Sequence, residues 1–183
     1  PPLAELLHDG CAVVVADLFR QGGSNGGQPA PLVGRKVRNP RDFAGYTFGY
    51  NEGLFASRVQ DLVTLAAHFQ YGEGTTREVH LIGVGGAGKY VAAARAIAGG
   101  EVASAAVDTE GFRFQDIASW RDRDFLPGAV KYGDMPGLLA LGAPHPLWLA
   151  GESVTPELTQ AAYHAAGGEV TLQRVNSDGA SAL

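Results

Sequence analysis

The sequence is poor in cysteine, methionine and lysine, and each shortage narrows what the protein can be. A single cysteine, Cys11, among 183 residues excludes an intrachain disulfide. Its place in the apolar run 11–16 predicts a buried thiol. The only methionine is Met135, so Pro1 is not an initiator residue and we expect the chain to be a processed piece of a longer polypeptide. Three lysines, eleven arginines and a net charge of −5 leave no extended basic patch, so nucleic acid is not an expected partner.

Long apolar runs are also lacking. No stretch approaches the roughly 18 uninterrupted apolar residues of a membrane span, so a membrane is not an expected partner. The first residues lack the pattern of a signal peptide, and the compartment stays open. A content of 45% hydrophobic and 18% charged residues is typical of a globular protein, and we expect a single domain over residues 1–183. Glycine is abundant instead, with 26 residues that gather in clusters.

Hydrophobic periodicity predicts alternating strands and helices. Strands are expected at residues 11–16, 79–82, 103–107, 146–150 and 169–175. Helices are expected at 3–8, 52–70, 89–98, 135–141 and 156–166, the last of them capped by Thr155. This alternation predicts an α/β fold with a mostly parallel, doubly wound sheet and helices on both faces.

Ligands of parallel sheets bind outside the carboxyl ends of the strands. The segments to follow are therefore the polar or glycine-rich ones that come directly after a predicted strand. They are Asp17 with the long irregular connection after it, the glycine segment 83–88, Asp108 to Gly111, Gly151 to Ser153, and residues 176–178. In other proteins, a carboxylate in such a place is often a turn or cap residue instead.

The glycine segment 83–88 fits the pattern G-x-G-x-x-G between a predicted strand and a predicted helix. In that setting Gly83, Gly85 and Gly88 let the backbone approach a pyrophosphate at the helix N-terminus. Asp108 lies 20 residues after Gly88, where such a site holds a carboxylate for a ribose hydroxyl. One interpretation is therefore a dinucleotide-binding module for NAD or NADP.

The same turn also fits the strand-to-helix elbow of an α/β-hydrolase. Segments spread along nearly the whole chain resemble the C-terminal two-thirds of acetyl-xylan-esterase-like α/β-hydrolases. They are residues 14–22, 46–51, 81–88, 107–112, 125–128, 131–134 and 143–148. The resemblance implies a three-layer hydrolase fold and a carbohydrate or small ester as ligand. The residues expected around that ligand are Gly83, Gly85, Gly86, Gly88, Asp17 and Tyr46.

The resemblance also implies a catalytic triad that this chain does not supply. Gly85 occupies the nucleophile position and has no side chain. The base is expected near residues 176–178, where there is no histidine, and the acid is expected at Glu152. We therefore expect a relative of the hydrolases that is either non-catalytic or atypical. Asp108 and Glu152 are the carboxylates left for a catalytic role. No metal site is expected. Whether it is an enzyme stays open.

In hydrolases of this type one further strand lies between those that correspond to residues 11–16 and 79–82. The resemblance therefore implies that the N-terminal strands of the fold are absent from this chain. An upstream segment or a partner chain is expected to complete the sheet, because buried unpaired backbone groups cost about 1–3 kcal/mol each. The charged run Arg121 to Asp124 is expected to be a solvated face.

Overall fold

The computed structural model describes residues 2–22, 44–72 and 78–173. Most of the long connection after Asp17 and the expected base region 176–178 lie outside these ranges. The helices are α1 (Pro2–His8), α2 (Ala44–Phe48), α3 (Leu54–Tyr71), α4 (Gly88–Ala98), α5 (Asp134–Ala140) and α6 (Glu157–Ala166). The strands are β1 (His80–Gly83), β2 (Ser104–Asp108), β3 (Leu147–Ala150) and β4 (Val170–Leu172). Short 3-10 helices are η2 (Gly99–Glu101), η3 (Phe114–Asp116) and η4 (Val130–Tyr132).

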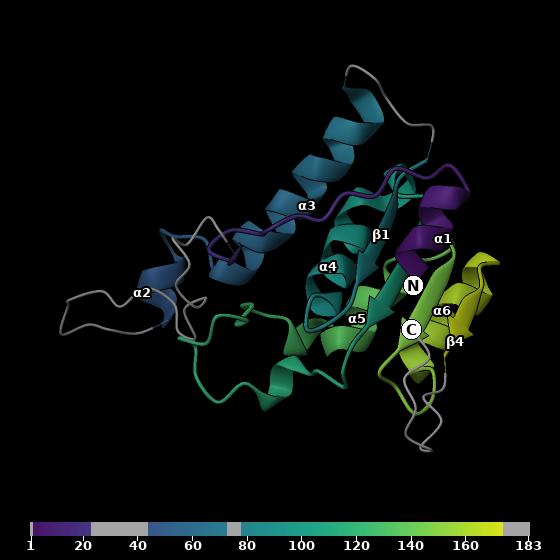
Figure 1. Ribbon diagram of the computed structural model, residues 1–183. Helices are drawn as coiled ribbons and strands as arrows, with labels where there is room; N and C mark the ends of the chain where they lie inside the picture. Colours follow the sequence, from purple (N-terminus) through teal and green to yellow (C-terminus); the bar gives the residue numbers. More distant parts are fainter. Residues whose placement is uncertain (1, 23–43, 73–77, 174–183) are drawn as a thin grey trace, which may run out of the picture.

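The four strands form one parallel sheet in the order β1-β2-β3-β4 (Figure 1). A helical connection crosses from each strand to the next, as parallel neighbours require. Four of the five predicted strands are confirmed within a residue or two of their expected bounds, except that β4 is shorter. The α/β class and the parallel sheet are therefore confirmed.

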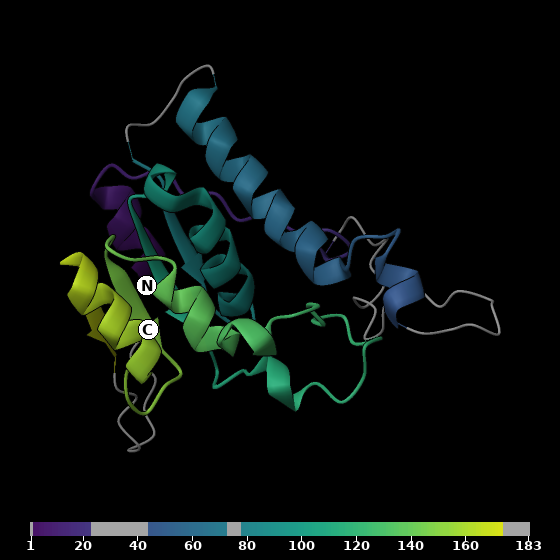
Figure 2. The same cartoon turned by 180° about the vertical axis from the view of Figure 1, so that it is seen from behind.

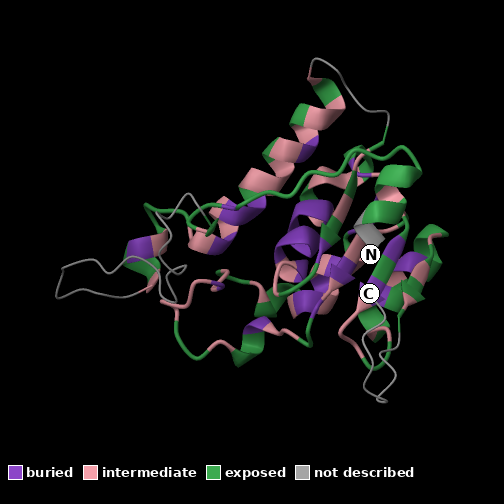
Figure 3. Cartoon of the chain, in the orientation of Figure 1, coloured by how far each residue is buried: buried purple, intermediate pink, exposed green. Residues whose placement is uncertain are grey.

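The helices α3, α4, α5 and α6 pack in succession and form one layer, with α4 against β1 and β2 (Figure 2). The side chains that face this layer, such as Ala105 and Leu147, are buried. Figure 3 shows how burial concentrates in α4 and the inner strands. The short helix α1 lies on the other side of the sheet in both views. On that side Ile82 and Trp148 remain 58% and 48% exposed.

The predicted strand 11–16 is wrong. Residues 11–18 have no regular secondary structure, and Val15 is 87% exposed. The buried thiol is wrong as well, because Cys11 is exposed. A β-branched run forms a strand only where a neighbouring strand takes its backbone hydrogen bonds, and no described strand pairs with this one.

The chain just after this run is fixed to α3. Leu18 is buried in the core, and the backbone N–H of Phe19 donates to the Asp61 carboxylate at 2.6 Å. The Arg58 side chain donates through Nε to the carbonyl of Phe19 at 3.2 Å. Asp17 therefore lies in an irregular segment just before an anchored turn, rather than at the end of a strand.

Two further details concern helices. Helix α6 begins at Glu157, with Pro156 rather than Thr155 in the capping position and no side-chain cap. Gly167 ends it with a left-handed φ of 70°, a conformation that glycine adopts without strain. Among the described helices, none combines the length and apolarity that crossing a bilayer requires.

Candidate functional site

A tight turn joins β1 to α4, and its conformation depends on glycine. The N–H of Ala87 donates to the carbonyl of Val84 at 3.2 Å, which closes the turn. Within it Gly85 and Gly86 have φ values of 59° and 83°. Two successive left-handed residues explain the glycine pair, since other residues adopt this conformation at a cost.

The outer glycines of the pattern are explained by packing instead. A Cβ on Gly88 would lie 1.9 Å from the carbonyl oxygen of Asp108, so α4 begins directly against the end of β2. A Cβ on Gly83 would lie 2.8 Å from Cγ2 of Val91. A Cβ on Gly85, in contrast, would meet nothing within 4 Å. Position 85 therefore faces open space at the carboxyl edge of the sheet.

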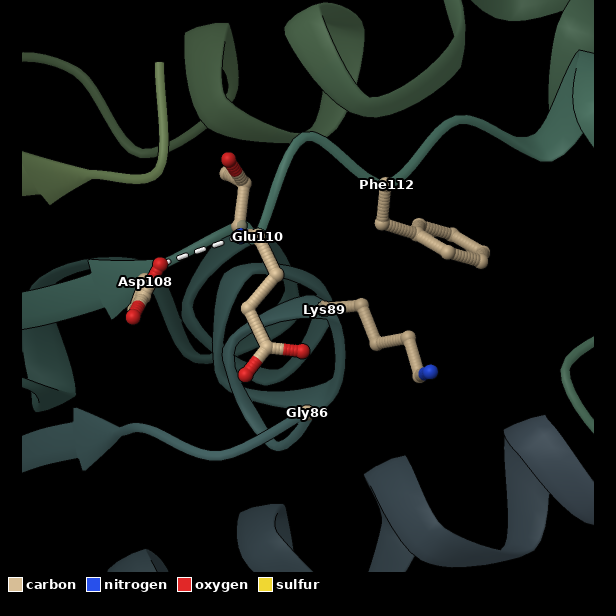
Figure 4. A pocket seen from close by; sticks show the side chains of 6 residues that line it. Gly86, Lys89, Asp108, Glu110 and Phe112 are labelled. Carbon is tan, nitrogen blue, oxygen red and sulfur yellow. Dashed lines mark hydrogen bonds between the residues drawn. The ribbon is translucent and has the colours of Figure 1, made fainter.

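A cavity of about 170 Å³ opens beside this turn, at the carboxyl end of β2 (Figure 4). Its lining comes from the turn, the start of α4 and the loop after β2. The lining residues are Gly86, Lys89, Asp108, Thr109, Glu110 and Phe112, and we name this space the Gly86–Phe112 cavity after the first and last of them. The candidate site thus lies where the parallel sheet predicted it.

Two carboxylates give the cavity an acidic side. Glu110 has a left-handed φ of 49°, and its Oε2 lies 3.8 Å from where a Cβ on Gly86 would be. Figure 4 shows its side chain reaching from the loop toward Gly86. Asp108 accepts the N–H of Glu110 through Oδ1 at 3.0 Å, which fixes the loop. Asp108 therefore has a turn-forming role in addition to its place in the cavity wall.

Lys89 forms the basic side. Its Nζ lies 2.7 Å from Oδ2 of Asp124 and 4.6 Å from the centre of the Phe112 ring. Asp124 is only 6% exposed, so the prediction of a solvated face is wrong for this residue. A buried carboxylate beside the cation holds Lys89 in one place on the cavity wall.

The same carboxylate ties the cavity wall to α3. The hydroxyl of Tyr90 donates to Asp124, and fully buried Arg58 donates to that hydroxyl at 2.5 Å. Burial, followed by the hydrogen bond to Asp124, raises the pKa of Tyr90 well above its usual value. Tyr90 therefore stays a neutral donor and takes no part in acid–base chemistry near neutral pH.

Glu152, the expected catalytic acid, is part of a structural ion pair. Arg113 donates to both of its carboxylate oxygens, at 2.8 and 2.6 Å, and the Thr109 hydroxyl donates at 2.7 Å. Burial raises the pKa of Glu152, but the hydrogen bonds from Arg113 and Thr109 and the charge of Arg113 outweigh it and lower the pKa. Glu152 is thus held ionised, and Thr109 cannot act as a free nucleophile.

The other predicted site residues lie elsewhere. Asp17 is exposed and packs against Gly22, and it is not among the residues that line the cavity. Tyr46 lies on α2, with its ring edge-on to Tyr50 at 6.3 Å, and does not line the cavity either. Of the predicted residues, Gly86 and Asp108 line the cavity together, Gly88 packs against Asp108, and Gly85 lies in the adjoining turn.

The lining of the cavity contains no serine, cysteine or histidine. The five histidines lie on helices α1, α3 and α6, on β1, and before β3, where the ring of His145 lies beside Gly100. In the described ranges no three metal-ligating side chains come together. The arrangement can therefore hold a polar ligand, and its lining lacks the serine, cysteine and histidine of a Ser-His or Cys-His pair.

Sequence reasoning included Glu110 only as part of the segment Asp108 to Gly111, and it missed Lys89, Phe112 and Asp124 as site residues. Lys89 could have been found, because it directly follows the last glycine of the turn at the start of a helix. The others depend on how the loop after β2 folds back, which no local pattern reveals. Comparison of the chain with protein-family models, curated proteins and solved structures found no match.

Proposed function

We propose that this protein is an α/β-hydrolase-like domain that binds a small carbohydrate or ester ligand at the Gly86–Phe112 cavity without nucleophilic catalysis. The observation that carries the proposal is the backbone at Gly85. Its φ of 59° and the open space around it match a turn that projects a residue from the top of the sheet. At that position this chain has no side chain.

The chemistry of the cavity wall supports such a ligand. The carboxylates of Asp108 and Glu110 accept hydrogen bonds from hydroxyl groups, and Lys89 donates to a hydroxyl or carbonyl oxygen. The Phe112 ring adds an apolar surface beside them. A polyhydroxylated ligand that carries an ester group uses all three kinds of contact.

Acetylated xylobiose is a suitable probe, followed by ¹H–¹⁵N correlation spectra of the full chain. We expect shifts of the backbone amides in 84–89 and 108–112, and weaker binding by about tenfold for Glu110→Gln. Glu169→Gln, an exposed change away from the cavity, serves as the control. Absence of shifts in these two segments would contradict the proposal.

Catalysis is tested separately with p-nitrophenyl acetate. The wild type is expected to hydrolyse it no faster than buffer. If the wild type does turn over the ester, and Glu110→Gln or Asp108→Asn abolishes this activity, the protein is an atypical enzyme instead. Gly85→Ser restores a hydroxyl at the turn, and any gain in turnover would support the elbow, whereas an unchanged rate with every ester tried would count against it.

A dinucleotide is the alternative, and one observation favours it. The pattern Gly83-x-Gly85-x-x-Gly88 does join a strand to a helix, and Gly88 sits at a close strand–helix contact. Against it, the Glu110 carboxylate lies over the turn where a pyrophosphate would bind. A ligand at a hundred times its Kd stabilises by about 2.7 kcal/mol, so the alternative requires a rise in Tm with NAD or NADP.

The hydrolase-like arrangement also includes a partner for the sheet. We propose that an upstream segment or a partner chain adds a strand beside β1, which is one of the two edge strands of the described sheet. Exposed Val14 and Val15 in an apolar run without a neighbouring strand support this. Intact-mass analysis of the purified native protein should then find further polypeptide, either as a second chain or as a longer single chain. A folded monomer of this chain alone would contradict the proposal.

A further inference from the structure

A second cavity, of about 280 Å³, lies in the segment between β2 and α5 and is separate from the Gly86–Phe112 cavity. This segment extends from the carboxyl edge of the sheet (Figure 1). The aromatic and aliphatic side chains of Phe114, Ile117, Phe125 and Leu126 form its walls. Its volume is just below the roughly 300–1,000 Å³ that is typical of small-molecule sites.

The walls are fixed by the rest of the fold. Phe114 is 4% exposed and packs with its ring 5.3 Å from Phe55 of α3. Phe125 packs at 5.4 Å from Phe48 of α2. Asp134 accepts the N–H of Phe114 at 2.7 Å, which holds the backbone of this wall. A groove between anchored aromatic rings is preformed and does not need to be opened by a ligand.

One cation borders this apolar groove. Lys131 lines it, and its Nζ lies 5.3 Å from the centre of the Tyr132 ring, which itself packs against Gly128. In the described part of the chain, no carboxylate comes within salt-bridge distance of Lys131. An apolar groove with an unpaired ammonium at its border matches a ligand that is apolar at one end and anionic at the other.

We propose that this groove binds a small aryl or alkyl carboxylate. The hydrocarbon part lies between Phe114 and Phe125, and the carboxylate pairs with Lys131. The described lining offers no second charge and no polar side chain other than Lys131. Charge on the ligand therefore decides how strongly it binds relative to a neutral molecule of the same shape.

The test compares 4-phenylbutanoate with its neutral amide, 4-phenylbutanamide, by titration of the full chain in ¹H–¹⁵N correlation spectra. Both are expected to shift the backbone amides of residues 112–131. The carboxylate should bind three- to fivefold more tightly, roughly the value of an exposed ion pair. Lys131→Met should remove this preference, and Lys131→Arg should keep it.

Ala129→Phe fills the groove and should abolish the shifts for both molecules, provided that Tm shows the variant is folded. Amides in 112–131 that do not shift with about 10 mM of either molecule would overturn the proposal, because that limit corresponds to negligible affinity. Equal affinities for the acid and the amide, or a preference that survives Lys131→Met, would overturn it as well. Shifts in 84–89 report on the Gly86–Phe112 cavity and so separate this proposal from the proposed function.

Discussion

Two apolar runs in this chain have similar compositions but different structures. Residues 11–16 and 103–107 are both short, rich in alanine and valine, and followed by aspartate, Asp17 and Asp108. The second run forms β2 in the middle of the sheet, with Val107 at 2% exposure. The first forms no strand and leaves Val15 at 87% exposure. An apolar composition therefore favours a strand, but whether the strand forms depends on the neighbouring strands and helices against which it can pack.

The largest expected effect contrasts the two valines. Val107→Asp buries a charge against α4 and should destabilise the fold by about 5 kcal/mol, enough to prevent folding. Val15→Asp should change the stability of this chain by less than about 0.5 kcal/mol, because the side chain is exposed. Far-UV circular dichroism and urea unfolding measure both. A large loss of stability from Val15→Asp would show that residues 11–16 are buried in solution, and the two runs would then not differ in burial.

The second contrast compares Gly88, which packs against the end of β2, with Gly10, which directly precedes the run 11–16. Gly88→Ala places a methyl group 1.9 Å from the Asp108 carbonyl oxygen, so α4 must move away from β2. We expect a loss of about 3 kcal/mol. Gly10→Ala, at a φ of 82° in open space, should cost only about 1 kcal/mol in urea unfolding. Equal losses would mean that helix and strand do not pack closely at Gly88.

The third prediction concerns Glu152, which joins the loops after β2 and β3. Glu152→Gln should lower stability by roughly 1.5 kcal/mol at pH 7, because it weakens a charge-assisted pair with Arg113. The pKa of Glu152 is lowered in the folded state, so its stabilisation is present above the unfolded value and is lost as the pH falls through the folded one.

The difference between wild type and Glu152→Gln should therefore shrink below about pH 4.3, the ordinary glutamate pKa. Urea unfolding between pH 7 and pH 3 measures it. Glu169→Gln, at an exposed position, should show no such trend. A difference that is constant with pH would argue against the ion pair.

The smallest expected effect is the difference between substituting Asp108 and substituting Asp17. Asp108→Ala removes the acceptor for the Glu110 N–H and should cost about 1 kcal/mol. It should also weaken binding of acetylated xylobiose at the Gly86–Phe112 cavity. Asp17→Ala should leave that binding unchanged, because Asp17 is not part of the cavity lining. Loss of binding from Asp17→Ala would place the two aspartates in one site.

Much of the fold follows from local patterns. The helix expected at 52–70 has apolar residues at steps of three and four and forms α3, with Phe55 and Val59 in the core. The glycine turn and Asp108 were likewise expected at one edge of the sheet. The failures share a cause, since the exposures of Cys11, Val15 and Asp124 all depend on contacts distant in sequence.

The sequence by itself determined the parallel α/β sheet, the tight turn at Gly85 and Gly86, and the lack of a nucleophile in that turn. Periodicity and backbone sterics act within a few residues, so a pattern suffices for these features. Only the tertiary structure decided that Glu152 pairs with Arg113, that Asp124 holds Lys89 at the cavity, and that the run 11–16 forms no strand. Each of these depends on burial and on partners brought from remote segments, which the local sequence does not encode.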